Sequence, residues 1–337
     1  MTHLRPSSDP ATAVEQLRGW LAAAVPELLL IETSGSSGRP KRVLLTRDAV
    51  VASARASAER VGTGRWALRL PSDYVAGVQV VVRSLLAGHD PVLGAWSDEQ
   101  GPATATSLVG TQLHRMLTDP DDVAALASMQ VVLLGGGPVD AGDRAAAEAA
   151  GIRVVATYGA SETAGGCVYD GFPLPGSTAE VDPDGRIRLG GPTIFSGYEG
   201  DPELTAQTLV AGAYLTSDGG RLEPDGRLVV LGRLDDVAVS GGVKVPMPAV
   251  AARLRGHPGV AVVEVLAVPD AEWGQRVVAF VEPAPGAEPD LAGLRDFVAD
   301  VHPRSWAPRQ LELRRPLPLL ANGKVDRQAL VRSVQEA

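Results

Sequence analysis

Short apolar segments alternate with helix-like segments through the first half of the sequence, and this alternation constrains the fold most strongly. Apolar runs at Trp66–Leu70, Pro91–Leu93 and Val131–Leu134 are typical of buried strands, and helix-like segments lie between them. Strands that alternate with helices favour an α/β architecture with a largely parallel sheet. The sequence therefore predicts a large N-terminal α/β domain built on such a sheet.

The pattern changes in the second half of the chain. Asp182–Gly185 and Glu223–Gly226 are turn signals, and alternating strand residues follow each of them, which predicts β hairpins. From Pro246 onward, the segments that predict a small α+β domain at the C-terminus are Ala249–Leu254, Val260–Val268, Val277–Val281, Leu291–Val301 and Leu311–Leu313. The best boundary is Gly232–Asp236, so we expect domains at residues 1–233 and 234–337.

The composition disfavours two classes of partner. The chain has 337 residues, which suggests about two domains, and a net charge of −9. Nonspecific nucleic-acid binding needs concentrated Lys and Arg, so we expect no nucleic-acid partner. No apolar run approaches the roughly 20 residues that span a bilayer, and Met1–Pro10 lacks the apolar core of a signal peptide. We therefore expect a cytoplasmic protein without membrane insertion. A single cysteine, Cys167, excludes a disulfide within one chain and a cysteine-based zinc site.

The loop Thr33–Lys41 directly follows an apolar strand at Leu28–Ile31 and has the residue types of a phosphate site. Glycines let backbone N–H groups converge on an anion, hydroxyls donate further hydrogen bonds, and Lys41 supplies charge. The glycines are three apart rather than five, so the loop is not a Walker A motif. Taken alone, it fits a solvent-exposed turn about as well. The residues expected to hold phosphate are Thr33, Ser34, Gly35, Ser36, Ser37, Gly38 and Lys41.

A second polar segment, Thr157–Thr163, also follows an apolar strand. The ring of Tyr158 could stack on a base, and Glu162 could be a hard oxygen ligand for Mg²⁺, which usually takes one or two carboxylates plus substrate phosphates. The alternative is an ordinary loop in which Ser161 caps a helix.

Two further segments lie in the second half. Asp218 could hold a pair of ribose hydroxyls, and Arg233 could reach ribose or phosphate. Asn322 and Gly323 form a tight-turn signal that presents Lys324 at its tip. The adjacent Asp235 and Asp236 would ordinarily form a solvated turn, and a lysine at the position of Lys324 is usually just exposed.

The order of these segments resembles the signature segments of the adenylate-forming superfamily, which includes acyl-CoA synthetases, luciferases and peptide-synthetase adenylation domains. The resemblance extends from Ile31 to Leu330 and implies a large N-terminal domain with a small, mobile α+β domain behind it. The segments that carry it are Thr33–Lys41, Gly135–Pro138, Tyr158–Glu162, Thr216–Asp218, Gly232–Gly242 and Asn322–Arg327.

The resemblance implies a two-step reaction. ATP and a carboxylate first give an acyl-adenylate and pyrophosphate, and a thiol, typically coenzyme A, then attacks the adenylate. In this scheme Lys41 grips the β- and γ-phosphates, Glu162 holds Mg²⁺, and Lys324 bridges the attacking carboxylate and the α-phosphate. The other implied roles are adenine contacts by Gly135, Gly136 and Tyr158, an α-phosphate contact by Ser161, ribose contacts by Asp218 and Arg233, a hinge at Asp235, and a CoA-facing segment of Ser240, Gly241 and Gly242.

A weaker resemblance concerns the acid. Leu70–Gly77 with the downstream Arg83 resembles the substrate segment of o-succinylbenzoate–CoA ligases, although Tyr74 stands where many relatives carry His. The start of the chain, shortly before the phosphate loop, resembles the short actinobacterial forms, in which we expect much of the usual N-terminal subdomain to be absent. o-Succinylbenzoate is a dicarboxylate, and Arg83 could bind its unreacted carboxylate. The equal alternative is that Arg83 caps a helix or forms an ion pair on a helix. Gly165 is expected to line the acid pocket.

The sequence therefore predicts an ATP-dependent acid–CoA ligase, with o-succinylbenzoate and menaquinone biosynthesis as the best-supported assignment. A ligase for another aryl or small carboxylic acid, and an adenylation domain that loads a carrier protein, are the alternatives. The expected cofactors and partners are ATP, Mg²⁺, coenzyme A and a small-molecule carboxylic acid. A homodimer is left open.

Overall fold

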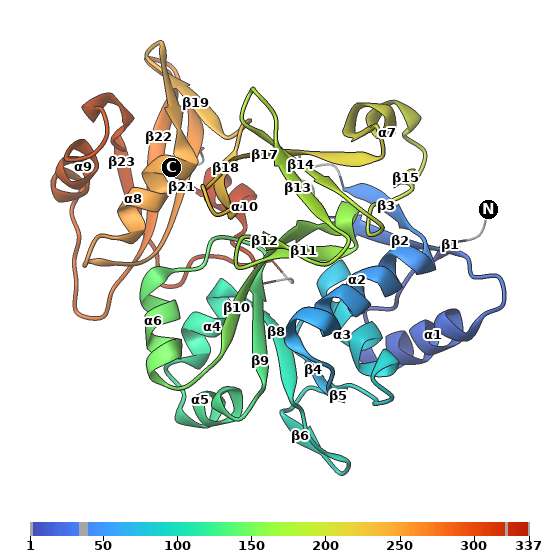
Figure 1. The fold of residues 1–337 in the computed structure, drawn as a ribbon. Coiled ribbons are helices and arrows are strands. Elements are labelled where there is room, and N and C mark those ends of the chain that lie inside the picture. Colours follow the sequence, from blue (N-terminus) through green and yellow to red (C-terminus); the bar gives the residue numbers. More distant parts are fainter. Residues whose placement is uncertain (1–2, 34–39, 321–322, 336–337) are drawn as a thin grey trace. The chain divides into compact units, whose positions relative to one another are not determined.

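The computed structural model describes residues 3–33, 40–320 and 323–335 (Figure 1). The chain divides into two compact units. Unit 1 comprises Met1–Thr216 and Leu222–Val229, and unit 2 comprises Ser217–Arg221 and Val230–Ala337. The predicted domain boundary after Arg233 stays a prediction.

A seven-stranded sheet forms the centre of unit 1. Its strands follow the order β12-β11-β10-β9-β8-β4-β5, in which all pairs from β10 to β5 are parallel and the two pairs beyond β10 are antiparallel. This arrangement confirms the predicted α/β class with a largely parallel sheet. The strands are β4 (Trp66–Leu68), β5 (Val92–Leu93), β8 (Ala105–Val109), β9 (Val131–Gly135), β10 (Val154–Ala160), β11 (Gly165–Tyr169) and β12 (Phe172–Pro173).

Helices cover both faces of this sheet, as Figure 1 shows. Side chains alternate between the two faces of a strand. Accordingly, Val131 and Leu133 of β9 pack in the core with the first three helices, whereas Val132 and Leu134 pack with the next three. Burial on both faces explains why the strands are continuous apolar runs. The helices are α1 (Pro10–Ala22), α2 (Arg47–Val61), α3 (Val75–Leu86), α4 (Gly110–Met116), α5 (Pro120–Ala127) and α6 (Ala141–Ala149).

Two smaller sheets complete this part of the chain. One has the order β1-β2-β3-β15, and the other has β13-β14-β17-β16 with β18 paired to β17. The predicted turns at Asp182–Gly185 and Glu223–Gly226 join β13 to β14 and β17 to β18, so both predicted hairpins are confirmed. The strands are β1 (His3–Leu4), β2 (Leu28–Thr33), β3 (Lys41–Leu45), β13 (Thr178–Val181), β14 (Arg186–Gly190), β15 (Gly197–Tyr198), β16 (Leu209–Val210), β17 (Ala213–Leu222) and β18 (Leu228–Arg233). The smaller elements are β6 (Ser97–Asp98), β7 (Gly101–Pro102), α7 (Pro202–Thr208) and the 3-10 helix η1 (Ser161–Thr163).

Unit 2 is a small α+β body, as predicted. Its sheet has the order β20-β19-β22-β21, with β23 paired to β22. Alternate residues of β21 and β22 pack against α8 and α9 on one face and against α10 on the other. None of the helices in the described residues is long and apolar enough to cross a membrane. The elements are β19 (Val237–Ser240), β20 (Val243–Pro246), α8 (Met247–Arg255), β21 (Val260–Asp270), β22 (Gly274–Pro283), α9 (Leu291–Ala299), η2 (Arg304–Trp306), β23 (Gln310–Leu313) and α10 (Arg327–Gln335).

Candidate active site

Glu162 lies in η1, the single turn of 3-10 helix between β10 and β11, and only 5% of it is exposed. The Tyr198 hydroxyl donates a hydrogen bond of 2.7 Å to Glu162 Oε1, and the Phe195 backbone N–H donates one of 2.9 Å to the Glu162 carbonyl. No group of three or more potential metal-ligating side chains occurs among the described residues. The donor set therefore fits Mg²⁺ held by one carboxylate and substrate phosphates, which is the usual pattern for this ion, rather than an all-protein metal site.

Tyr198 connects Glu162 to the phosphate loop. The Lys41 ammonium nitrogen lies 5.5 Å from the centroid of the Tyr198 ring, within the range of a cation–π interaction. Burial and the adjacent Glu162 carboxylate raise the pKa of the Tyr198 phenol, so it remains a neutral donor. The sequence did not indicate this residue. β15 is only two residues long, and Tyr198 pairs with Val43 from a distant part of the chain.

The phosphate loop spans the end of an antiparallel hairpin. β2 and β3 pair with Thr33 opposite Lys41, and the Thr33 hydroxyl donates to the Lys41 carbonyl at 3.5 Å. The two ends of the loop are thus fixed side by side, and both residues are partly buried. The remaining predicted phosphate residues Ser34, Gly35, Ser36, Ser37 and Gly38 lie outside the described residues.

The two predicted adenine segments lie next to each other on neighbouring strands. Gly135 ends β9, and a Cβ at this position would lie 2.6 Å from Thr157 Oγ1 on β10. Gly136 has a φ of 84°, which favours glycine. Tyr158 follows on β10 and is partly buried. Close packing on Thr157 explains the glycine at position 135, and the positive φ explains the one at position 136, so their predicted contacts with adenine stay a prediction.

Ser161 begins η1, but the hydroxyl that satisfies the backbone here belongs to Thr163. The Ala160 N–H donates to Thr163 Oγ1 at 2.8 Å, and that hydroxyl donates to the Gly165 carbonyl at 2.6 Å. The helix-capping alternative for Ser161 is therefore wrong, because Thr163 fills that role. The predicted α-phosphate contact of Ser161 stays a prediction.

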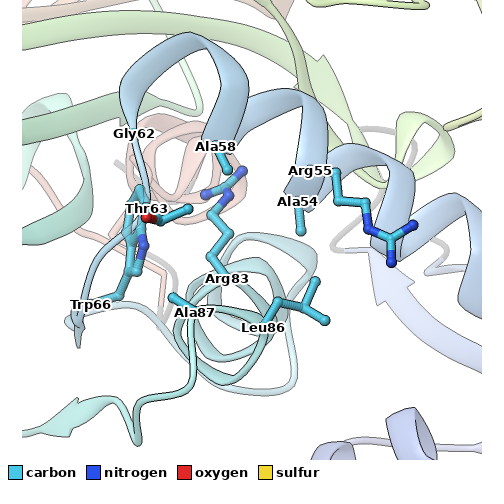
Figure 2. Close-up of a pocket in the computed structure, with 9 residues that line it drawn as sticks. All are labelled: Ala54, Arg55, Ala58, Gly62, Thr63, Trp66, Arg83, Leu86 and Ala87. Carbon is cyan, nitrogen blue, oxygen red and sulfur yellow. The ribbon is translucent and has the colours of Figure 1, made fainter.

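The predicted acid-binding residues of α3 have distinct environments. Tyr74 is partly buried at the N-cap of α3, and burial raises its pKa. Gly77 packs so closely on the preceding loop that a Cβ would lie 2.0 Å from the Pro71 carbonyl oxygen. Arg83 is buried and lines a cavity of about 160 Å³ between α2 and α3 (Figure 2). Its guanidinium carbon lies 5.1 Å from the centroid of the Trp66 ring.

Predicted nucleotide residues also lie in unit 2. Arg233 Nε donates to Asp235 Oδ1 at 2.8 Å, so the predicted ribose ligand is ion-paired with the predicted hinge residue. Crowding by surrounding protein lowers the pKa of Lys324, and the carboxylate of Asp218 acts in the opposite direction. Because the Lys324 side chain is still exposed, we interpret this as partial desolvation rather than full burial. Asn322 lies outside the described residues.

The segment that carries Lys324 is anchored by ionic contacts. The Leu320 N–H donates to the Lys324 carbonyl at 2.8 Å. At the start of α10, Arg327 Nη2 donates to Asp236 Oδ2 at 2.6 Å, and its Nε lies 2.8 Å from Glu264 Oε1. Arg327 thereby ties the lysine segment to the residue that follows Asp235. Its place in a signature segment could have drawn attention to it, but its partners are too distant in sequence to predict.

The predicted CoA segment forms the two-residue turn between β19 and β20. Gly241 and Gly242 have φ values of 58° and 78°, as such a turn requires, and Ser240 pairs with Val243. Ser240 is buried, and Arg309 Nε donates to its hydroxyl at 3.3 Å. The turn geometry alone explains the two glycines, so their role toward CoA stays a prediction.

Residues 27–199 match the AMP-binding enzyme family, and residues 249–324 match the AMP-binding enzyme C-terminal domain. The chain is 43% identical over 321 residues to the probable 2-succinylbenzoate–CoA ligase of Mycobacterium tuberculosis (strain ATCC 25618 / H37Rv), covering 90% of this chain and 84% of the relative. It is 32% identical over 337 residues to the 2-succinylbenzoate–CoA ligase of Geobacillus kaustophilus (strain HTA426), covering 90% and 69%.

Among solved structures, the o-succinylbenzoate CoA synthetase of Bacillus subtilis in complex with the acyl-adenylate intermediate OSB-AMP is similar, with a TM-score of 0.76 and 26% identity. The match covers 90% of this chain and 68% of that chain. These similarities confirm the predicted superfamily, and the chain belongs to the AMP-binding enzyme family.

Proposed function

We propose that this protein is an ATP-dependent acid–CoA ligase that acts through an acyl-adenylate, with o-succinylbenzoate as its acid. The main structural support for this reaction class is that Tyr198 contacts both Lys41 and Glu162. A cation for phosphate oxygens and a carboxylate for Mg²⁺ are held together by one buried phenol. This pairing suits a magnesium–triphosphate substrate.

In the first half-reaction, a carboxylate oxygen of the acid attacks the α-phosphorus of ATP. The new P–O bond forms as the bond to pyrophosphate breaks. Lys41 holds the leaving phosphates, Glu162 holds the Mg²⁺ that neutralises them, and Ser161 contacts the α-phosphate. Lys324 stabilises the charge that develops on the reacting oxygens. Gly135, Gly136 and Tyr158 contact adenine, and Asp218 and Arg233 bind the ribose.

In the second half-reaction, the sulfur of coenzyme A attacks the acyl carbon, AMP leaves, and the thiol proton passes to solvent. Asp235 serves as the hinge between the two half-reactions, and Ser240, Gly241 and Gly242 face coenzyme A. Gly241 and Gly242 are exposed in the β19–β20 turn, which suits close approach of the thiol-bearing arm of coenzyme A.

The assignment of the acid is supported by Arg83 and by the names of the relatives. o-Succinylbenzoate has a carboxylate that is not activated, and a buried guanidinium can bind it in a bidentate manner. Tyr74, Gly77 and Gly165 complete the proposed acid pocket. A ligase of this kind serves menaquinone biosynthesis and works in the cytoplasm, and it is compatible with a homodimer.

A pyrophosphate-release assay with o-succinylbenzoate, benzoate and amino acids, each with and without coenzyme A, tests the proposal. We expect release with o-succinylbenzoate and formation of its CoA thioester. Turnover of benzoate without turnover of o-succinylbenzoate would refute the acid and keep the class. Release that depends on an amino acid, without a CoA thioester, would indicate an adenylation domain that loads a carrier protein.

A further inference from the structure

A buried polar seam runs where α2, α3 and β11 meet in unit 1. Residues four apart on a helix share one face, and alternate residues of a strand share one face. The seam therefore has two layers, each formed by one residue from each of the three elements. One layer consists of Ser53, Gln79 and Gly165, and the other of Ser57, Arg83 and Tyr169.

Tyr169 fixes Arg83 in the second layer. The Arg83 Nη2 group donates to the Tyr169 hydroxyl at 3.2 Å, and the Ser57 hydroxyl lies 2.8 Å from the same oxygen. The Trp66 ring lies beside the guanidinium. Tyr169 is fully buried in a strand, so its hydroxyl has a defined position. Arg83 is thus held by a hydrogen bond to a phenol and by contact with an indole ring, and both of these groups are neutral.

Three buried polar atoms of the seam have no hydrogen-bond partner, namely Ser53 Oγ, Gln79 Oε1 and Arg83 Nε. The orientation of the Gln79 amide is not arbitrary, because its Nε2 donates to two carbonyls, of Val50 at 3.1 Å and of Ala164 at 2.8 Å. Its oxygen must therefore face elsewhere. Buried polar atoms are nearly always bonded to protein, ligand or ordered water, so three in one seam indicate that a polar partner enters it.

The charge of Arg83 points to an anionic ligand. Burying a guanidinium is costly unless an opposite charge compensates it. Among the described residues, the side-chain partner of Arg83 is the phenol of Tyr169, not a carboxylate. Figure 2 shows Arg83 extending from α3 toward α2, with its guanidinium beside Ala58, whereas the Arg55 side chain extends away from it. Arg83 is therefore the cation placed inside this part of the fold, and a carboxylate matches its planar donors.

We propose that Tyr169, supported by Ser57, positions Arg83 to bind the carboxylate of the acid that is not adenylated. This inference rests on the proposed function and extends it. Tyr169 acts through Arg83 and is a positioning residue. Without its hydroxyl the long Arg83 side chain regains rotamer freedom, which weakens binding of the second carboxylate. The pair Tyr169–Arg83 then sets the preference for a dicarboxylic aryl acid over a monocarboxylic one.

The Tyr169→Phe variant tests this inference because it removes the hydroxyl and keeps the ring. Two acids are compared in the pyrophosphate-release assay: o-succinylbenzoate, and its analogue in which hydrogen replaces the carboxylate that is not adenylated. We expect the KM for the dicarboxylate to rise about tenfold with kcat nearly unchanged, as for loss of one hydrogen bond to a charged group. The KM for the monocarboxylate should change less than about twofold, because the analogue has no group for Arg83. Ser57→Ala should shift the same ratio in the same direction.

Thr106→Val is the matched control. It also removes one fully buried hydroxyl, which donates to the Ala67 carbonyl at 2.9 Å, but it lies in β8 rather than in the seam. It should leave the ratio of the two KM values unchanged. Equal effects of Tyr169→Phe on both acids, or no effect on either, would refute the positioning role. If the wild-type protein fails to turn over o-succinylbenzoate, the proposed function itself is refuted. Failure of the proposed function is therefore distinguishable from failure of the positioning role.

Discussion

At the scale of single residues, we expect substitution of Tyr198, which the sequence did not indicate, to lower both stability and Mg²⁺ affinity. Tyr198→Phe removes the donor to a buried carboxylate, Glu162. Leaving a buried charged acceptor without its partner costs about 1–3 kcal/mol. We therefore expect a loss of unfolding free energy of that size and a several-fold rise in the Mg²⁺ concentration needed for half-maximal adenylation. Urea denaturation and pyrophosphate release against Mg²⁺ concentration measure the two effects.

The control for this prediction is Tyr214→Phe. Tyr214 belongs to the same aromatic cluster, with its ring centroid 5.8 Å from that of Phe195. We expect Tyr214→Phe to leave the Mg²⁺ dependence unchanged. An identical shift in both variants would show that the cluster's packing, rather than the bond to Glu162, sets the Mg²⁺ dependence.

Cys167 gives a pH dependence of stability. It is buried in β11, and burial raises the pKa of its thiol from 9.0 to about 12. Between these values the unfolded chain releases the proton and the folded chain keeps it. This contribution to stability is complete below about pH 9 and is lost as the pH rises toward 12. The stability advantage of wild type over Cys167→Ala should therefore fall by about 1 kcal/mol between pH 9 and pH 10. Urea denaturation at the two pH values measures it, and a constant difference would contradict the assigned burial effect.

At the scale of elements, two helical glycines should respond oppositely to the same substitution. A Cβ at Gly77 in α3 would lie 2.0 Å from the Pro71 carbonyl oxygen, which is backbone and cannot rotate away. A Cβ at Gly19 in α1 would meet nothing within 4 Å. Overpacking usually lowers the unfolding free energy by about 1–3 kcal/mol. Because the clash at Gly77 is with backbone, Gly77→Ala should lower it by more than this usual cost. Gly19→Ala should raise it by about 0.5–1 kcal/mol, because alanine favours helix over glycine.

Denaturation of the two variants in urea measures these changes. An unchanged unfolding free energy in Gly77→Ala would mean that α3 can move away from the loop that precedes it. Packing would then not explain the glycine, and a role in substrate binding would remain. The result thus separates a structural reason for this glycine from a functional one.

Elements were predictable from the sequence where their determinants are local. Val131–Leu134 is an apolar run bounded by turns, and Asp182–Gly185 is a turn signal, so both gave correct expectations. The pairing of Tyr198 with Val43 was not predictable, because it depends on a two-residue strand that meets β3 from far along the chain. The buried seam was hidden for the same reason. Ser57, Arg83 and Tyr169 are ordinary residues of two helices and a strand until folding places them together.

At the scale of the whole molecule, the residues proposed for the reaction are distributed over both compact units. Lys41 and Glu162 belong to unit 1, and Lys324 belongs to unit 2 with Asp218, Arg233 and the proposed hinge residue Asp235. Local sequence patterns predicted which residue types take part, but they did not predict the contacts that hold those residues in place. The contacts of Arg327 with Asp236 and Glu264, which hold the lysine segment within its unit, join three widely separated parts of the sequence.

Lys324→Ala should therefore lower the rate of the first half-reaction much more than the rate of the second. In the proposed mechanism the ammonium stabilises charge in adenylation, and loss of one such group commonly costs about 10²-fold or more in rate. We expect adenylation to fall by at least that factor, measured as pyrophosphate release with o-succinylbenzoate. Thioester formation from supplied acyl-adenylate and coenzyme A should remain close to the wild-type rate, because that step does not include attack of a carboxylate on the α-phosphorus, which is the event that Lys324 assists in the proposed mechanism. Lys244→Ala removes another exposed lysine of the same unit, on β20, and should leave adenylation unchanged. Equal losses in both half-reactions of Lys324→Ala would assign the lysine to a step that they share, such as holding the adenylate, instead of to formation of the phosphoester bond.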